Sequence, residues 1–378
     1  MVAQPQPLIE LFAEMPDFRC ARGKRHPLPA ILSLACCAML CGYRSYSAIA
    51  EWGQNYGVRL AQALGFTHKT PCAATLHTVF RHLARDIIEA TLGTWAENML
   101  GCTPTAPPQE APAVALDGKT LRGSRAQGAP GVHLLSAVAH HGGLTIGQQA
   151  VDTKTNEITA VDTMLRQLVL PGRVFTMDAL LTQRHVAQTI VDAGSDYVMI
   201  VKDNQPRLRA DIALVFMLPP AGDRQDTART VDIGHGRIEQ RHITTSEALV
   251  GYSDWPGLAQ VFELGRYVIT PKTGEDRGEI VYGVTSLRPE RVPPGQLLAF
   301  VRGHWHIENK SHWVRDVTFD EDRSQVRCGN IPHVMAALRN TIIGLLRWAG
   351  HTNIAAACRQ LAAQPVRALA LLGIVLEN

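Results

Sequence analysis

The chain has 378 residues, of which 46% are hydrophobic and 19% are charged, and its formal net charge is +3. This composition is typical of a soluble globular protein, and the length exceeds one compact core and is enough for two or three domains. The small net charge is compatible with nucleic-acid binding only if the basic surface is local.

The cysteines and apolar runs exclude two classes of protein. The eight cysteines lack the paired CxxC spacing of a zinc site, and three of them lie in the apolar run of residues 31–41. That run is too short to span a bilayer, and no signal peptide precedes it. We therefore expect a protein of the reducing cytoplasm, with no membrane contact.

The first 100 residues are expected to form an all-helical domain. Their periodicity predicts a short helix at residues 8–15, a buried helix at 29–42, and further helices at residues 46–53, 58–64, 75–83 and 86–100. Residues 16–28 hold Arg19, Arg22, Lys24 and Arg25 between Pro and Gly, which predicts an exposed basic loop. Phosphate contact and simple solvation both fit this loop. Likewise, the domain could bind DNA through one helix or be a plain helical bundle.

A Pro-rich linker at residues 101–112 marks a domain boundary, and after it the pattern changes. A buried strand at 113–116 ends at Asp117, and strands at 133–140 and 144–151 flank a HisGlyGly hairpin turn. Helix and strand then alternate, with predicted elements at 158–170, 173–177 (ending at Asp178), 181–193 and 197–201. This order predicts an α/β fold with a ribonuclease-H-like mixed sheet, whose first part spans residues 113–205.

The remaining chain is predicted in two parts. Residues 206–290 contain strand-like runs at 230–232, 237–244, 258–270 and 279–286, which predict a β-rich insertion. Residues 291–378 read as helices, and the helix at 296–314 carries Glu308. A strongly amphipathic helix is expected at 332–347, followed by closing helices at 354–376.

Three acids in this scheme suggest a metal site. Asp117 and Asp178 follow buried strands, where side chains face the ligand crevice of an open sheet, and Glu308 lies on a helix that could cross that crevice. Oxygen ligands suit Mg²⁺ or Mn²⁺, and two such ions support in-line phosphoryl transfer. Each acid alone has a simpler explanation. Asp117 could be a turn aspartate before Gly118, Asp178 could cap the helix beginning near Leu181, and Glu308 could form a surface ion pair. Their joint fit to one fold favours the metal site.

Five segments of the chain resemble the DDE transposases of bacterial insertion sequences, and the H-repeat-associated family in particular. They are LeuAspGlyLysThrLeuArgGly (116–123), ThrLysThrAsnGluIleThrAlaVal (153–161), PheThrMetAspAla (175–179), AspTyrValMetIleValLysAspAsnGlnPro (196–206) and residues 302–322, which begin ArgGlyHisTrpHisIleGluAsn. The N-terminal ProAspPheArg and ArgGlyLysArgHisProLeu are similar to the helical domain of that family.

The resemblance implies a set of functional properties. Asp117, Asp178 and Glu308 would be the catalytic triad and the ligands of Mg²⁺ or Mn²⁺, with two ions expected. The partners would be DNA, as terminal inverted repeats and target DNA, and a second copy of the chain to pair two ends. The protein would then be nucleoid-associated.

Two departures from the family pattern bear on this expectation. The YREK signature of related transposases falls on Val301, His304, Glu308 and Arg315, so only its glutamate is retained. After Asp178, Leu181 stands where the family usually has histidine.

Further residues are predicted to contact DNA. Lys119 and Arg122 follow the first aspartate, and Lys202, Asn204 and Gln205 end the last core strand. Trp305 could stack on a displaced base or pack in the core, whereas Trp313 is expected in the core. The acids at 316 and 320–322 are expected to pair with Arg315, Arg323 and Arg327. The remaining candidates around the glutamate are Arg302, His304, Asn309, Lys310 and Arg315.

Parts of the sequence also suggest four other functions. A zinc hydrolase would use His304, Glu308 and His312, but the HExxH order is missing. GlyLysThr at 118–120 is no P-loop, because Ala113 occupies the position of the required glycine. A retired transposase that only binds DNA as a regulator, and a ribonuclease-H-like nuclease without strand transfer, both remain open.

Overall fold

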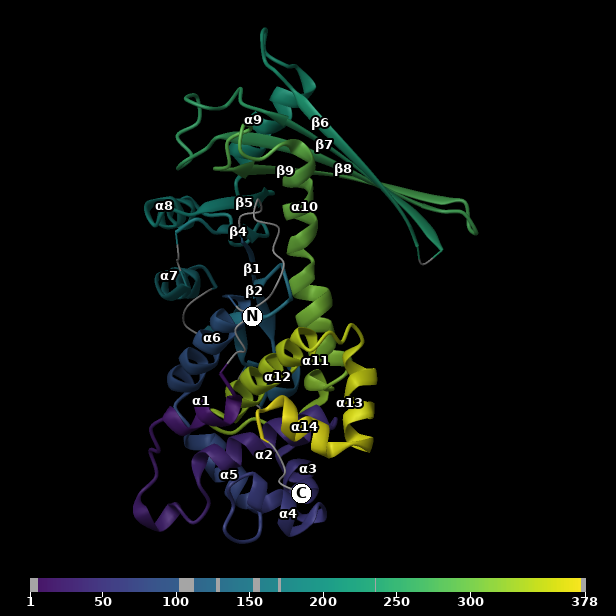
Figure 1. Ribbon diagram of the computed structural model, residues 1–378. Coiled ribbons are helices and arrows are strands. Elements are labelled where there is room, and N and C mark those ends of the chain that lie inside the picture. Colours follow the sequence, from purple (N-terminus) through teal and green to yellow (C-terminus); the bar gives the residue numbers. More distant parts are fainter. Residues whose placement is uncertain are drawn as a thin grey trace. The chain divides into compact units, whose positions relative to one another are not determined.

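The computed structural model describes residues 6–101, 112–126, 130–151, 157–168, 171–234 and 236–374, except for the side chain of Arg22 (Figure 1). It is a mixed α/β fold whose strands form one nine-stranded sheet in the order β3-β2-β1-β4-β5-β9-β8-β7-β6. The chain divides into two compact units. Unit 1 comprises residues 1–110, 118–154 and 307–378, and unit 2 comprises residues 111–117 and 155–306. Most of the predicted linker, residues 102–111, lies outside the described residues.

The predicted N-terminal helices of unit 1 are confirmed. They are α1 (Leu8–Glu14), α2 (Leu28–Leu40), α3 (Tyr46–Asn55), α4 (Gly57–Ala63), α5 (Ala73–His82) and α6 (Arg85–Gly101). The apolar sequence of α2 is almost wholly buried. Helix α3 begins where the Ser45 hydroxyl accepts a hydrogen bond from the backbone N–H of Ala48. Helix α2 packs against α1 and α3, which covers their apolar faces.

The C-terminal helices belong to the same unit. They are α12 (Ile331–Trp348), α13 (Ile354–Ala363) and α14 (Pro365–Leu371). The predicted amphipathic helix is confirmed as α12, but its polar face is buried as well: every residue from Ile331 to Leu346 is buried, because α2, α5, α6 and β3 all pack against it. Helix α12 is therefore the central helix of unit 1.

The predicted hairpin of unit 1 is also confirmed. Strands β2 (His133–Ala139) and β3 (Thr145–Val151) pair antiparallel. The turn between them needs the left-handed backbone that glycine adopts without strain, and Gly142 and Gly143 have φ of 73° and 64°. The side chain of Gln148 on β3 donates to Glu89 on α6 at 3.0 Å and accepts from Asn340 on α12 at 3.0 Å.

The α/β part of unit 2 follows the predicted order. Strand β1 (Ala113–Thr120) pairs in parallel with β4 (Val174–Met177), and β4 with β5 (Asp196–Val201). Helices α7 (Glu157–Leu168) and α8 (Arg184–Asp192) connect them. Two boundaries differ from the prediction. Strand β1 runs on through Asp117 to Thr120, and α8 begins three residues after Leu181.

The β-rich segment continues this sheet. Strands β6 (Asp226–Gly234), β7 (Arg237–Ser246), β8 (Gln260–Thr270) and β9 (Glu275–Thr285) form an antiparallel ribbon, and β9 pairs with β5 (Figure 1). A helix that the sequence pattern did not predict, α9 (Pro206–Met217), precedes the ribbon. Helix α10 (Pro294–His304) packs across it, with Leu297 and Phe300 in one cluster with Phe262.

The predicted helix at 296–314 is interrupted at the glutamate. After α10, the chain forms a π-helical turn, η3 (Ile307–His312), and then the short helix α11 (Trp313–Val317). π-Helical turns are rare in proteins, and many of those that occur lie at functional sites. Among the described residues, none of the helices has the length and apolar character needed to cross a membrane.

Candidate functional site

The two aspartates occupy matching positions on neighbouring strands of unit 2. The parallel register of β1 and β4 ends at the pair Leu116 and Met177, and Asp117 and Asp178 are the next residues of the two strands. Neighbouring strands lie about 4.8 Å apart, and residues in register share a face of the sheet. Asp178 is exposed and Asp117 is half-buried. The fold therefore brings the first two predicted acids together.

A tight turn behind Asp178 holds this carboxylate in place. Its Oδ1 accepts a hydrogen bond from the backbone N–H of Leu180 at 3.0 Å. The Thr182 hydroxyl lies 3.0 Å from the carbonyl oxygen of Asp178 and 2.7 Å from that of Ile200, so it ties the turn to β5. Leu181 is buried. Asp178 thus caps its own turn, and the alternative explanation that it caps α8 is wrong, because α8 begins after Gln183 without a side-chain cap.

Asn204 and Gln205 hold the same turn from the other side. The Asn204 amide donates to the carbonyl oxygens of Ala179 at 2.6 Å and Thr182 at 3.3 Å. The Gln205 amide donates to the carbonyl oxygen of Thr182 at 3.1 Å. Their predicted role as phosphate contacts is therefore corrected, because these amide donors already bind backbone carbonyls. They position the loop that carries Asp178, whereas Lys202 has an exposed side chain and stays a candidate for phosphate contact.

His304, at the end of α10, lies beside the second aspartate. Its Nδ1 is 3.2 Å from the Thr176 hydroxyl on β4. Burial lowers the pKa of His304, and the nearby negative charge of Asp178 opposes this shift only in part. The lowered pKa favours the neutral ring at pH 7, and the predicted contact of His304 with DNA stays a prediction.

Two other predicted residues of α10 differ in their surroundings. The Arg302 guanidinium forms an ion pair with Asp232 at 2.9 Å. Trp305 is 55% exposed, and the guanidinium carbon of Arg266 lies 6.0 Å from the centre of its ring. Trp305 is thus accessible, as a stacking role requires, whereas Arg302 is partly engaged within unit 2.

Glu308 lies in unit 1, on the turn η3, and its side chain is exposed. Asn309 beside it is exposed too, and Lys310 is half-buried. Burial, together with the positive charge of Arg347, lowers the pKa of Lys310. Within the described ranges, no three His, Cys, Asp or Glu side chains are grouped closely enough to hold a metal ion. The donor chemistry of the three acids, all carboxylate oxygens, nevertheless suits Mg²⁺ or Mn²⁺.

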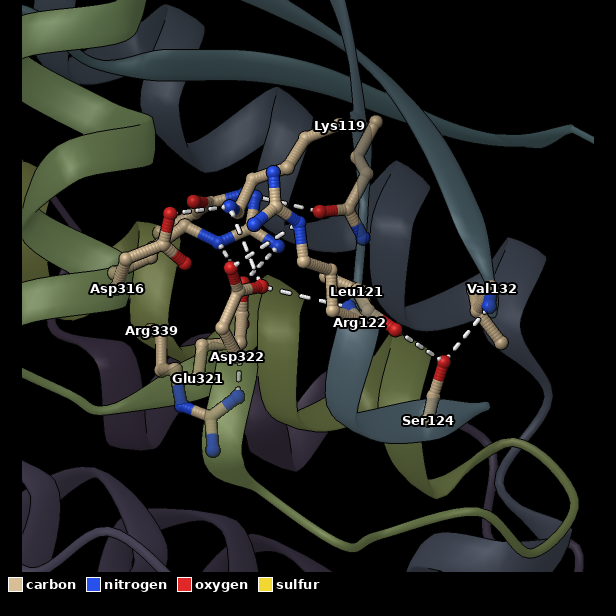
Figure 2. A network of polar contacts seen from close by, with 12 residues as sticks. Lys119, Leu121, Arg122, Ser124, Val132, Asp316, Glu321, Asp322 and Arg339 are labelled. Atoms are coloured by element: carbon tan, nitrogen blue, oxygen red, sulfur yellow. Dashed lines mark hydrogen bonds and ion pairs between the residues drawn. The ribbon is translucent and has the colours of Figure 1, made fainter. Parts of the chain in front are cut away.

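Figure 2 shows a polar network at the end of β1, within unit 1. The Lys119 ammonium lies 2.6 Å from the Asp316 carboxylate and 3.9 Å from that of Asp322, and Lys119 is only 9% exposed. Its predicted DNA contact is corrected, since its charge is already paired. Arg122 pairs with Asp322 at 3.6 Å but keeps an exposed side chain, so it stays a candidate.

A buried ion-pair trio forms the rest of this network. The Glu321 carboxylate accepts hydrogen bonds from Nε of Arg315 at 2.8 Å and from Nη1 of Arg339 at 2.8 Å, and all three side chains are buried. The predicted pairing of Arg315 with a nearby acid is confirmed. Its predicted contact with DNA is wrong in this structure, because no part of the side chain is exposed. The prediction that Trp313 packs in the core is also wrong, since Trp313 is 56% exposed.

The N-terminal basic loop is partly engaged in its own structure. The Arg19 side chain binds the Asp17 carboxylate at 2.9 Å and the carbonyl oxygens of Gly23 and His26. Arg19 therefore shapes the loop, whereas Lys24 and Arg25 are exposed and remain candidates for phosphate contact. The side chain of Arg22 lies outside what the structure describes.

Comparison with known families identifies the class of protein. A family model described as "Transposase DDE domain" matches residues 108–345, and one described as "DDE_Tnp_1-associated" matches residues 9–96. The first covers more than half of the chain. The chain therefore belongs to the DDE transposases.

Individual relatives are similar along most of the chain. The putative protein YbfL of Escherichia coli K12 is 31% identical over 350 residues, which cover 90% of each chain. The H repeat-associated putative transposase YhhI of the same organism is 30% identical, again over 90% of each chain. An uncharacterized protein from the dhlA 3′ region of Xanthobacter autotrophicus is 36% identical over 68% of this chain and 86% of its own.

Proposed function

We propose that this chain is the transposase of an insertion sequence, which cleaves transposon ends and joins them to target DNA by phosphoryl transfer with two metal ions. Asp117, Asp178 and Glu308 are the proposed catalytic residues and metal ligands. The observation that carries the proposal is the register of β1 and β4, which brings the two aspartates to matching positions where the paired segment ends. Membership of the DDE transposases supports the third acid.

The strand order supports a ribonuclease-H-like core. The strands β3-β2-β1-β4-β5 are neighbours in that order, with β2 and β3 antiparallel and β1, β4 and β5 parallel. Such a core places acids from the first and fourth strands next to each other. The ribbon β6–β9 then extends this core at the β5 edge.

The proposed metal ions would polarise the scissile phosphate and the attacking oxygen. The roles of the other residues follow from their contacts. Thr182, Asn204 and Gln205 fix the turn that carries Asp178. The carboxylate is therefore already in position before DNA binds, and its ordering costs no free energy at that step. The proposed partners are terminal inverted repeats, target DNA and a second copy of the chain, because two ends must be joined together.

A nicking and strand-transfer assay tests the proposal. The purified chain is incubated with Mg²⁺ and a labelled duplex ending in the element's inverted repeat. We expect Asp117→Asn, Asp178→Asn and Glu308→Gln each to lower the cleavage rate by about 10³-fold, as when a group that stabilises transition-state charge is removed. Asp203→Asn is the matched control, because this aspartate of unit 2 is 95% exposed and outside the triad.

The same assay separates the alternatives. Binding of the repeats without cleavage by the wild-type chain would identify a DNA-binding regulator. Cleavage of any duplex, without strand joining, would identify a ribonuclease-H-like nuclease. Equal cleavage by the wild type and Asp178→Asn would refute the catalytic assignment.

A further inference from the structure

A large pocket of unit 1 carries a concentration of positive charge. It has a volume of about 1070 Å³ and is lined by the end of α2, the turn η3, α11, and the connection from α12 to α13. Four cations line it, and Asp and Glu are absent from the residues described around it. We call it the basic pocket and define it by Arg44, Lys310, Trp313, Arg347, His351 and Arg359. In a chain of net charge +3, this is a marked local excess.

The fold holds the side chain of Arg347 and the backbone of Arg44 in place. Arg347 donates to the carbonyl oxygen of Gly143 at 3.2 Å, and the carbonyl oxygen of Arg44 accepts from Arg339 at 3.2 Å. The Arg44 guanidinium is half exposed and lies 3.8 Å from the Asp320 carboxylate. Burial lowers the pKa of Arg347 to about 10. Burying the charge of Arg347 costs free energy, and an anion in the pocket would offset that cost.

The pocket also offers a surface for a flat apolar group. Trp313 is 56% exposed although it is large and aromatic, and Val314, Val317 and Ile354 line the pocket with it. The N-terminus of α13 adds partial positive charge at Asn353. Cations combined with an exposed aromatic ring are the arrangement by which proteins bind single-stranded nucleic acid: the cations contact phosphate and the ring stacks on a base.

We propose that the basic pocket binds an unstacked nucleotide of a DNA strand, with its base against Trp313 and its phosphates at Arg44, Lys310 and Arg359. The proposal rests on the proposed function, because a transposase supplies the reason for a DNA strand. Lys310 is two residues from Glu308 on the same turn η3. The strand held in the pocket therefore adjoins the turn that carries the proposed third catalytic acid.

Equilibrium binding tests the pocket without any chemistry. A fluorescent single-stranded oligonucleotide is titrated with full-length Asp178→Asn protein in EDTA. In this background, we expect Trp313→Ala to weaken binding about 5- to 150-fold, the loss found when a stacking ring is removed. Arg359→Gln should reduce the slope of log K against log salt by about 0.7, the change expected for one phosphate contact on a single strand.

Two exposed residues outside the pocket provide matched controls. Trp348 is 37% exposed on α12, and Arg367 is exposed on α14 with only a contact to Gln364. Trp348→Ala and Arg367→Gln should leave affinity and salt slope unchanged. Unchanged affinity for Trp313→Ala, or equal losses in both tryptophan variants, would overturn the proposal.

Cross-linking keeps the proposal testable even if a variant misfolds. An oligonucleotide containing 5-iodouracil is irradiated with the Asp178→Asn protein, whose tryptophans are all retained. We expect the adduct on the tryptic peptide of residues 311–315, which contains Trp313. An adduct confined to the peptides of Trp305 or Trp348 would contradict the proposal.

The outcome for the pocket is independent of the outcome for catalysis. If the wild type fails to nick DNA while Trp313→Ala loses binding, the pocket stands and the transposase proposal falls. If the wild type nicks and joins DNA while Trp313→Ala binds normally, the reverse holds.

Discussion

Glu321 lies between two buried arginines, and replacing it should be among the most destabilising single changes in unit 1. Glu321→Gln keeps the size and shape of the side chain but removes its charge. Arg315 and Arg339 are 0% and 2% exposed, so two cations would remain buried without a countercharge. The perturbation is therefore electrostatic and leaves the packing intact.

The structure sets the size of this effect. Removing one partner of a buried ion pair costs about 3–5 kcal/mol, and here one carboxylate serves two cations, which favours the upper end. A domain is stable by only about 5–15 kcal/mol. With a urea dependence of about 3 kcal/mol/M, the unfolding midpoint should fall by about 1–1.7 M.

Urea unfolding at a series of pH values tests the reasoning. Burial would raise the pKa of Glu321, but the charges and hydrogen bonds of the two arginines outweigh it and lower that pKa below its ordinary 4.5. A carboxyl whose pKa is depressed on folding stabilises the fold above its unfolded pKa. The difference between the wild type and Glu321→Gln should thus be constant from pH 7 to about pH 5, and should shrink as the pH falls through the folded pKa.

Asp320→Asn is the matched control. This neighbouring carboxylate is 39% exposed and lies 3.8 Å from each of two arginines, so its removal should cost about 0–1 kcal/mol. Asparagine also tolerates the left-handed backbone at this position, where φ is 53°. A loss for Glu321→Gln no greater than that for Asp320→Asn would refute the argument. Replacing Arg315, Glu321 and Arg339 together by apolar residues should recover part of the loss.

Three further predictions concern local contacts. Asn204→Ala should lower the cleavage rate about 10- to 100-fold, because it removes hydrogen bonds that hold the turn behind Asp178. Its melting temperature should stay nearly unchanged. A decrease in melting temperature larger than that of the control Asp203→Asn would indicate a fold defect instead. Gly123→Ala should destabilise the chain by about 1–3 kcal/mol in urea, because its Cβ would lie 2.1 Å from the carbonyl oxygen of Ser324. Cys72 is exposed and should react with a thiol reagent in the native protein, whereas Cys36, whose pKa is raised by burial, should react only after unfolding.

The helices and core strands could be predicted from the sequence, because their buried residues form apolar runs or periodic patterns within short segments. The apolar run at 29–42 forms a buried helix, and the runs before Asp117 and Asp178 form neighbouring strands. An acid directly after each of two short apolar runs can be recognised in the sequence alone.

Pairing between distant strands could not be predicted in this way. The ribbon read as a separate β-rich insertion, yet β9 joins the core sheet at β5. Much of β9 is exposed and charged, so its sequence does not show which strand it pairs with. The helix α9 was missed within a segment whose dominant pattern is that of strands.

The predicted DNA contacts show the same limit at the level of side chains. Arg315 and Trp313 lie on one short helix. From residue type alone, the charged arginine is expected at the surface and the aromatic tryptophan in the core. The opposite holds, because Glu321 and Arg339 enclose the arginine. Similarly, a side-chain amide after a strand can donate a hydrogen bond to a phosphate or to a backbone carbonyl. The sequence does not show which, and in the structure Asn204 donates to the backbone of the turn that follows Asp178.

The central claim is that Asp117, Asp178 and Glu308 hold the same metal ions, and iron-directed cleavage of the protein tests it most directly. Fe²⁺ replaces Mg²⁺ in the complex with an inverted-repeat duplex, and ascorbate with peroxide generates hydroxyl radicals at the bound metal. We expect chain cuts near residues 117, 178 and 308 that depend on the metal and are suppressed by excess Mg²⁺. Cuts near residues 117 and 178 without any near residue 308 would contradict the claim.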